Sequence, residues 1–196
     1  FCNHLLGHVR GGLSFVNITA SMLFAGISGT AISDTASLGA VMIPAMKKEG
    51  YDSDFSCAIT AASSTVGPII PPSLPMIIAA TLSGLSVGKL FLAGAIPGLL
   101  LGLGLMLVAY FVAKKKNYPK HPKSTPLQIF KSFIKTFWAL LMTVIILFGI
   151  VGGVFTPTEA SVVAVLYALF IGLFVYKKLN LRNISVVVLD SMKTTA

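Results

Sequence analysis

Long apolar stretches, broken by short polar or proline-rich interruptions, constrain the fold of this chain more than any other feature. The stretches lie at about 13–46, 55–82, 87–113, 137–151 and 157–175. A helix needs about 20 apolar residues to cross the roughly 30 Å hydrocarbon core of a bilayer. Apolar residues make up 55% of the chain and charged residues only 11%, which is too little charge to cover a soluble surface. We therefore expect an all-α polytopic membrane protein.

The first apolar stretch, residues 13–46, does not fit an ordinary span. It is too long for one span at about 1.5 Å per residue and too short for two spans with a proper turn. Its middle, residues 25–37, reads AGISGTAISDTAS and holds glycine, hydroxyl groups and one acid. Irregular backbone at membrane depth is tolerated only where protein buries it or where it lines a wet cavity. We predict a re-entrant helical hairpin with a polar tip.

The second apolar stretch, about 55–82, is interrupted by the sequence SSTVGPIIPPS at residues 63–73. Pro68, Pro71 and Pro72 lack the N–H donor that a regular helix needs, so the helix cannot continue through them. We predict a discontinuous membrane helix at this place.

A continuous helix is expected at 87–113. After it we expect a basic loop, an amphipathic interfacial segment, two further spans and a second interfacial segment, at about 114–124, 125–135, 137–151, 157–175 and 180–193. The net charge of +9 comes from basic clusters between the apolar stretches, which is the positive-inside pattern and not a nucleic-acid surface. If the first stretch is re-entrant, every cluster is cytoplasmic and only Lys89 lies opposite.

The polar middle of the first stretch is a candidate binding site. Its polar side chains are Ser28, Thr30, Ser33, Asp34, Thr35 and Ser37. Hydroxyl groups and freed carbonyls are hard oxygen ligands that suit a small alkali cation, and the N-termini of half-helices favour an anionic substrate. In the alternative interpretation, Ser33 or Asp34 merely caps the second half-helix.

The interruption of the second stretch is the other candidate. Ser63, Ser64 and Thr65 precede Gly67, and the prolines leave earlier carbonyls without helical partners. These oxygens could complete a cation shell with the hairpin tip. A kinked packing helix, whose hydroxyls bond back to its own carbonyls, is the alternative.

Other features point to structure more than to chemistry. Thr156 and Glu159 have the spacing of a capping box with Pro157 at the first helical position. The sequence has no phosphate-binding loop, no HExxH motif and no paired-cysteine metal site. We expect no cofactor, and no metal other than the alkali cation of the candidate site.

Six sequence strings together resemble the large membrane subunit of tripartite ATP-independent periplasmic (TRAP) transporters. They are GHVRGGLSFVN, SMLFAGISGTAISDTASLG, IPAMKKEGY, TAASSTVGPIIPPSLPMII, GKLFLAGAIPG and GVFTPTEA. The resemblance implies a bacterial inner-membrane protein of two inverted repeats, each with a re-entrant hairpin and a broken helix. Residues 1–113 would be the first repeat, 114–136 a cytoplasmic loop with an interfacial helix, and 137–196 the start of the second repeat. The chain would then be an interior fragment.

The resemblance also implies sodium-driven uptake, with a soluble periplasmic binding protein and a small membrane subunit as partners. By the family pattern one sodium site would be formed by Ser28, Gly29, Thr30, Ser63, Ser64, Thr65 and Gly67. We expect the substrate path to be lined by Ser33, Asp34, Thr35, Pro72 and Ser73.

The sequence thus predicts a symporter subunit, not an enzyme, that imports a small carboxylate of the dicarboxylate, sugar-acid or sialic-acid type by alternating access. An ion or solute channel on the same broken helices is the alternative. A membrane enzyme using Asp34 or a serine lacks a base in the same segment, and a structural scaffold does not explain two costly polar interruptions.

Overall fold

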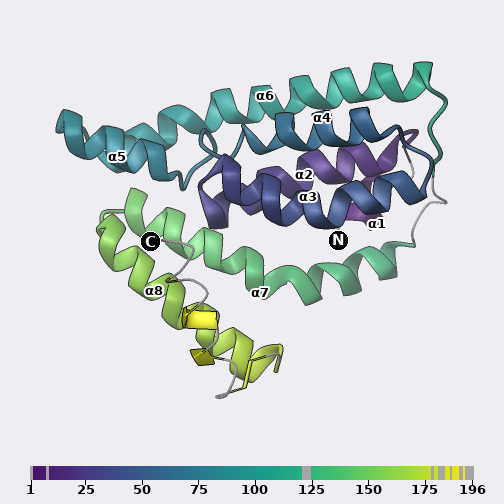
Figure 1. Cartoon of the computed structure of the whole chain (residues 1–196). Helices are drawn as coiled ribbons and strands as arrows, with labels where there is room; N and C mark the ends of the chain where they lie inside the picture. The colour runs from purple at the N-terminus through teal and green to yellow at the C-terminus, as the bar shows by residue number, and fades with distance from the viewer. Residues whose placement is uncertain are drawn as a thin grey trace.

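The computed structural model of the chain describes residues 2–7, 9–120, 125–177, 179–180, 184–185, 187–189 and 192. Within these residues every regular element is helical, as the sequence predicts (Figure 1). The elements are α1 (Cys2–Leu6), α2 (Gly12–Ser28), α3 (Ala31–Lys48), α4 (Ser53–Ser64), α5 (Leu74–Ser83), α6 (Val87–Lys115), α7 (Pro126–Val151), α8 (Pro157–Phe170) and the π-helix η1 (Ile171–Val175). The interfacial segment predicted at 180–193 falls mostly outside the described part of the chain.

A two-residue turn joins α2 and α3 into a helical hairpin (Figure 1). Gly29 ends α2 in the left-handed conformation, with φ of +61°, and its N–H donates to the Ala25 carbonyl at 2.9 Å. Glycine adopts this conformation without the Cβ clash that other residues suffer. Thr30 then caps α3, because its hydroxyl accepts from the Ser33 N–H at 3.4 Å. The predicted break in the first apolar stretch is confirmed.

The second apolar stretch is also interrupted, as predicted. Helix α4 ends at Ser64, turns follow, and α5 begins at Leu74. Ser73 caps α5: its hydroxyl accepts from the Met76 N–H at 3.3 Å and donates to the Pro68 carbonyl at 2.6 Å. The prolines therefore end one half-helix, and a serine begins the next.

In the described part of the chain, three helical segments are long and apolar enough to cross a membrane: Val87–Lys115, Pro126–Val151 and Pro157–Val175. Many of their apolar side chains are exposed, for example Leu92 and Leu100 on α6, and such faces need lipid or further protein to cover them. The amphipathic segment expected at 125–135 is not a separate helix but the first part of α7. No proline or glycine separates it from the apolar part that follows, so the helix simply continues.

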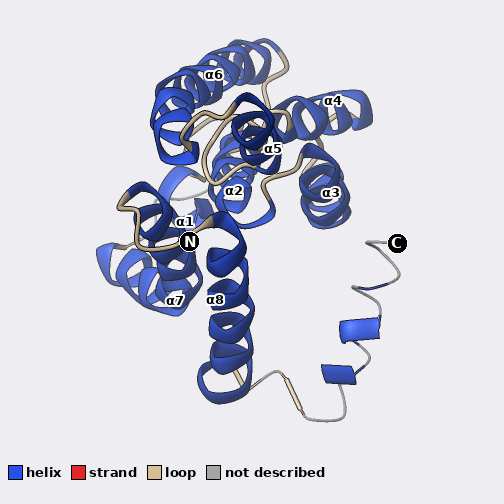
Figure 2. Ribbon diagram, turned by 90° about the vertical axis from the view of Figure 1, so that its left-hand side faces the viewer, coloured by secondary structure: helices blue, strands red, loops and turns tan. Residues whose placement is uncertain are grey.

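Small residues on α6 allow close packing against the two broken segments. A Cβ on Gly98 would overlap Ile70, and a Cβ on Gly102 would overlap Met22 of α2. Two apolar clusters result. One joins α2, α3, α4 and the end of α6 around Ile18 and Met46, and the other joins α5 to α8 around Phe91. Figure 2 shows the first four-helix group above α7 and α8.

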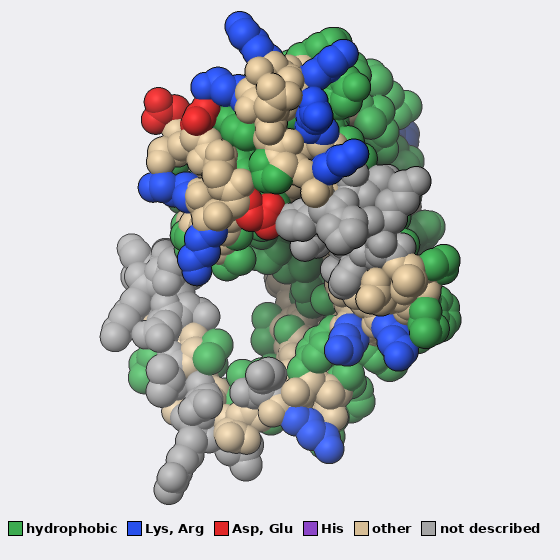
Figure 3. Space-filling model, turned by 90° about the vertical axis from the view of Figure 1, so that its right-hand side faces the viewer, with side chains coloured by type: hydrophobic (Ala, Val, Ile, Leu, Met, Phe, Trp, Pro, Cys, Tyr) green, Lys and Arg blue, Asp and Glu red, His purple; other side chains and the backbone are tan. Residues whose placement is uncertain are grey.

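The loop after α6 fastens the base of the hairpin and of α4. The carboxylate of Asp52 accepts hydrogen bonds from the Lys116 ammonium and, at 3.0 Å, from the Tyr118 hydroxyl. Next to them the Arg10 guanidinium donates to the Asn117 side chain at 3.1 Å. We call Asp52, Lys116 and Tyr118 the α6 clamp. Lys and Arg side chains gather on this end of the molecule (Figure 3), so the basic clusters at its base lie together as the charge pattern predicts.

The α6 clamp predicts a pH-dependent stability. Hydrogen bonds from Lys116, and then from Tyr118, hold the pKa of Asp52 below its usual value. A lowered folded-state pKa contributes stability that is complete above the unfolded value of about 4 and is lost as the pH falls through the folded value. At pH 7 we expect Asp52→Asn to lower the melting temperature of the detergent-purified protein. As the pH falls below ~4 the difference from wild type should shrink, and it should vanish once the pH lies below the folded-state pKa of Asp52.

Asp54→Asn is the matched control, because Asp54 is exposed two residues further on and does not accept the hydrogen bonds of the clamp. Equal melting temperatures for Asp52→Asn and wild type at pH 7 would show that the clamp carries no stability.

Candidate functional site

The hairpin tip and the interrupted helix meet directly. The Leu74 N–H donates to the Gly29 carbonyl at 3.3 Å. A Cβ on Gly29 would lie 3.1 Å from both the Leu74 nitrogen and the Pro72 carbonyl oxygen. Two segments that are far apart in the sequence thus form one junction of irregular backbone.

Asp34 lies at the centre of this junction. It is fully buried in the first turn of α3, and its Oδ1 accepts a hydrogen bond from the Ser28 hydroxyl. Its Oδ2 is buried and has no hydrogen-bond partner among the described residues. A Cβ on Gly67 would lie 2.7 Å from this oxygen and 3.1 Å from the Ser64 carbonyl oxygen. The bare Gly67 backbone therefore leaves the space into which the free carboxylate oxygen points.

The predicted hydroxyl groups divide into buried and exposed ones. Ser63 and Ser64 are fully buried, and both donate to the Thr60 carbonyl, at 3.1 and 2.9 Å. Thr65 is exposed and donates to the Ala62 carbonyl of its own helix at 2.7 Å. Back-bonding of this kind is what the kinked-helix interpretation expects, so these hydroxyls presently bond to helix carbonyls while Asp34 supplies the free oxygen.

Of the predicted substrate-lining residues, some line a pocket and others do not. Ser33 and Thr35 are exposed on α3, and the Thr35 hydroxyl donates to the Ala31 carbonyl at 2.8 Å. Pro72 and Ser73 do line a pocket beside the hairpin tip, whereas Asp34 faces Gly67 instead.

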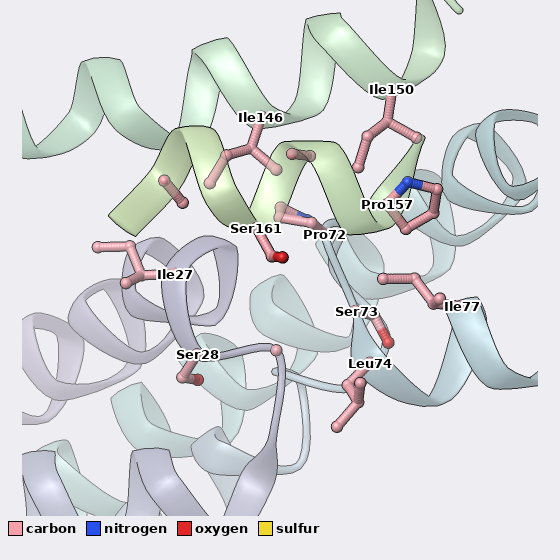
Figure 4. Close-up of a pocket in the computed structure, with 13 residues that line it drawn as sticks. Ile27, Ser28, Pro72, Ser73, Leu74, Ile77, Ile146, Ile150, Pro157 and Ser161 are labelled. Carbon is pink, nitrogen blue, oxygen red and sulfur yellow. The ribbon is translucent and has the colours of Figure 1, made fainter. Parts of the chain in front are cut away.

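The pocket has a volume of about 240 Å³ and lies between the junction and the helices α7 and α8 (Figure 4). Its walls are formed by Ile27, Ser28, Gly29, Pro72, Ser73, Leu74, Ile77, Ile146, Ile150, Pro157, Ala160, Ser161 and Ala164. Most of the wall is apolar, and Ser28, Ser73 and Ser161 are its hydroxyl groups. This is the composition of a site that orients a small ligand with few polar contacts.

The ends of four half-helices are collected around the junction. The C-termini of α2 and α4 carry partial negative charge, and the N-termini of α3 and α5 carry partial positive charge. A cation is therefore favoured near Ser28 and Ser64, and an anion near the first turns of α3 and α5.

Sequence reasoning missed two parts of the site. Ser161 contributes from α8, a helix that the sequence predicted as a span but not as part of the site. The predicted cap of this helix is confirmed, because the Thr156 N–H donates to Glu159 at 2.8 Å and the Glu159 N–H to the Thr156 hydroxyl at 3.3 Å. Buried polar residues below the junction, such as Asn17 and Thr60, were also missed. Their spacing of three or four residues from Ser21, Ser63 and Ser64 was the available signal.

Three candidate membrane spans within the described residues, beside a hairpin and an interrupted helix, indicate a polytopic membrane protein. The whole chain, residues 1–196, matches the family model described as "Tripartite ATP-independent periplasmic transporter, DctM component". The chain belongs to this family, which is a family of multi-pass permeases of the bacterial inner membrane and not of enzymes.

Named relatives are similar along the whole chain. The sialic acid TRAP transporter permease protein SiaT of Haemophilus influenzae is 47% identical over 195 residues, which cover 100% of this chain and 32% of SiaT. The large permease protein SiaM of Vibrio cholerae is 46% identical over 196 residues, 100% of this chain and 46% of SiaM. The C4-dicarboxylate permease protein DctM of Pseudomonas aeruginosa is 45% identical over 195 residues, again 100% and 46%. The chain thus spans 32% to 46% of the length of these relatives.

The close approach of Gly67 to Asp34 predicts the effect of one methyl group. Gly67→Ala should lower the stability by about 1–3 kcal/mol, because the added methyl overlaps a carboxylate and a backbone carbonyl. The measurement is the melting temperature of the detergent-purified protein.

Gly104→Ala in α6 is the matched control, because nothing lies within 4 Å of a Cβ at that position. Replacing a helical glycine by alanine there should leave the melting temperature equal or slightly higher. Similar melting temperatures for both variants would mean that Gly67 does not face the carboxylate.

Proposed function

We propose that the chain forms the first-repeat part of the transport site in a sodium-coupled symporter that imports a small organic acid. The observation that carries the proposal is the buried carboxylate of Asp34. Among the described residues it has one hydrogen-bond donor, Ser28, and no cationic partner. A buried carboxylate without a counter-charge is unfavourable by several kcal/mol. A sodium ion between this carboxylate, the Ser28 hydroxyl and the Ser64 carbonyl would offset that cost.

The surroundings of Asp34 support a small cation as the partner. The Asp34 carboxylate, the Ser28 hydroxyl and the Ser64 carbonyl supply oxygen atoms, which are the ligands of hard cations. The C-terminal ends of α2 and α4 add the partial negative charge of their helix dipoles. The proposal therefore assigns Asp34 to the cation and leaves Pro72 and Ser73 to the substrate.

The pocket beside the junction supports an anionic substrate. The Gly29 and Leu74 ends of the pocket lie at the N-termini of α3 and α5, which attract negative charge. The names of the relatives refer to sialic acid, C4-dicarboxylates and 2,3-diketo-L-gulonate, all of which carry carboxylate groups. We extend this to the present chain as a dicarboxylate, sugar-acid or sialic-acid substrate.

The length of the hairpin helices supports a re-entrant hairpin within the proposed transporter. At about 1.5 Å per residue, the 17 residues of α2 reach only roughly 25 Å, which is short of a full span and suits a re-entrant hairpin. In the complete transporter a second, inverted repeat would contribute the other half of the site. A periplasmic binding protein would deliver the substrate, and a small membrane subunit would complete the assembly. Binding of sodium and substrate must strengthen each other equally, since coupling free energies are reciprocal.

Asp34→Asn tests the proposal in the full-length transporter, reconstituted in proteoliposomes with its partners and binding protein. The amide keeps the shape of the side chain but removes the charge that attracts the cation. We expect the sodium concentration for half-maximal uptake to rise at least about tenfold, since a charged ligand contributes more than a neutral hydrogen bond. Sodium-dependent uptake is measured across a panel of organic acids.

Asp54→Asn is the charge-matched control, because Asp54 lies exposed at the basic end of the molecule. The assignment of Asp34 to a sodium site would be refuted in two cases. One is wild-type uptake that does not depend on the sodium gradient, and the other is an unchanged sodium dependence of uptake in Asp34→Asn. Non-saturating downhill flux would favour a channel.

A further inference from the structure

Helices α2 and α4 share a polar interface outside the cation site proposed around Asp34, Ser28 and Ser64. It includes Ser63, which the family pattern placed among the sodium ligands but whose hydroxyl bonds to Ser21 and Thr60. The Asn17 side-chain amide donates to the Thr60 hydroxyl at 2.7 Å, and the hydroxyls of Ser21 and Ser63 are hydrogen-bonded at 2.9 Å. All four side chains are fully buried. We call these four residues the α2–α4 seam. It lies where two helices in an apolar membrane would normally pack through small or apolar side chains.

The seam fixes how the two helices are aligned. Its two pairs join residues 43 and 42 positions apart in the sequence, so α2 and α4 run parallel and their C-termini lie at the same end. Beyond the seam, α2 leads to Ser28 at the hairpin tip, and α4 leads through Ser64 to Gly67. The seam is therefore the last paired contact between the two helices before the Asp34 junction.

The junction tolerates little error in this alignment. Sliding α4 by one residue would shift it by about 1.5 Å and rotate its side chains by about 100°. Yet one methyl group on Gly67 would already lie 2.7 Å from Asp34. Apolar contacts accept several alignments, whereas paired hydrogen-bonding groups lose their partners when one helix slides.

We propose that Asn17, Ser21, Thr60 and Ser63 are positioning residues, which hold α4 in the register that brings Gly67 to Asp34 and thereby set the sodium affinity. This inference rests on the proposed sodium site. Within the α2–α4 seam, Thr60 has the strictest geometric requirement. Its hydroxyl accepts a hydrogen bond from Asn17 and also donates one to the Ser56 carbonyl at 2.7 Å. Asn17 Oδ1 has no partner in the described part of the chain, so loss of the Thr60 oxygen leaves the amide without any hydrogen-bonded oxygen.

The chain offers variants that separate positioning from simple packing. Thr60→Val removes the hydroxyl at nearly equal volume, Thr60→Ser keeps it, and Ser21→Ala removes the second pair. Ser14→Ala and Ser56→Ala are matched controls. Both of these serines are fully buried on the same two helices, but their hydroxyls bond to carbonyls of their own segments, Gly11 at 2.7 Å and Asp52 at 2.8 Å.

The first readout is sodium-dependent uptake by the full-length transporter in proteoliposomes, together with its melting temperature in detergent. We expect Thr60→Val and Ser21→Ala to raise the half-saturating sodium concentration about three- to tenfold, the range that one hydrogen bond supplies. Thr60→Ser and the two controls should stay near wild type. If Thr60→Val and Ser21→Ala lower the melting temperature but leave the sodium response unchanged, the seam is only structural and the proposal is overturned.

A second readout does not depend on transport. With Cys2 and Cys57 replaced by alanine, cysteines are placed at Ile27 and Leu74, which line the same pocket from the tip and from α5. Cross-linking by a short bismaleimide should be slower in Thr60→Val than in Ser56→Ala. Equal cross-linking rates in the two variants would refute the proposal that the α2–α4 seam holds α4 in register. Should wild-type uptake prove independent of sodium, the proposed function fails, and the cross-linking rates alone decide whether the seam sets the register.

Discussion

The structure depends on a carboxylate that is buried where two helices are broken. Asp34 is held on one side by the Ser28 hydroxyl, and on the other it faces backbone that only glycine leaves bare. The short turn at Gly29, the proline-rich interruption and the caps Thr30 and Ser73 all bring irregular backbone to this place. Broken helices in an apolar medium expose unpaired polar groups. Their meeting at one acid is what supports the proposed binding of a cation and an anionic substrate beside each other.

Much of this arrangement could be predicted from the sequence. Pro68, Pro71 and Pro72 cannot continue a helix, and the polar run around Asp34 cannot lie within an ordinary span, so both interruptions were foreseen. The helices at 87–113 and 157–175 followed from length and apolar character, and the Thr156 cap from its spacing. These features are local, because each is determined by residues within one or two turns of each other.

The rest depends on which helix faces meet, and no local pattern contains that information. The meeting of the two broken segments was predicted. That Gly67 lies against Asp34, or Ser21 against Ser63, was not, since each pair joins separate segments of the chain. Asp34 was expected on the substrate path, and its position one turn into α3 points it toward the break instead. The amphipathic residues 125–135 were expected to form their own helix, but amphipathic character alone does not end a helix, and α7 continues through them.

Helix α6, with the α6 clamp at one end, connects two distant parts of the molecule. One end is fastened through Lys116 and Tyr118 to the base of α4, and the other packs through Phe91 against α7 and α8. Its 29 residues extend over roughly 43 Å. If Pro97 inside the helix leaves α6 straight, a tilt of about 5° at the fastened end would displace the far end by roughly 4 Å over this length. That is comparable to the width of a side chain. Small rearrangements among the charged groups at one end would therefore be felt as a change in the walls of the pocket at the other.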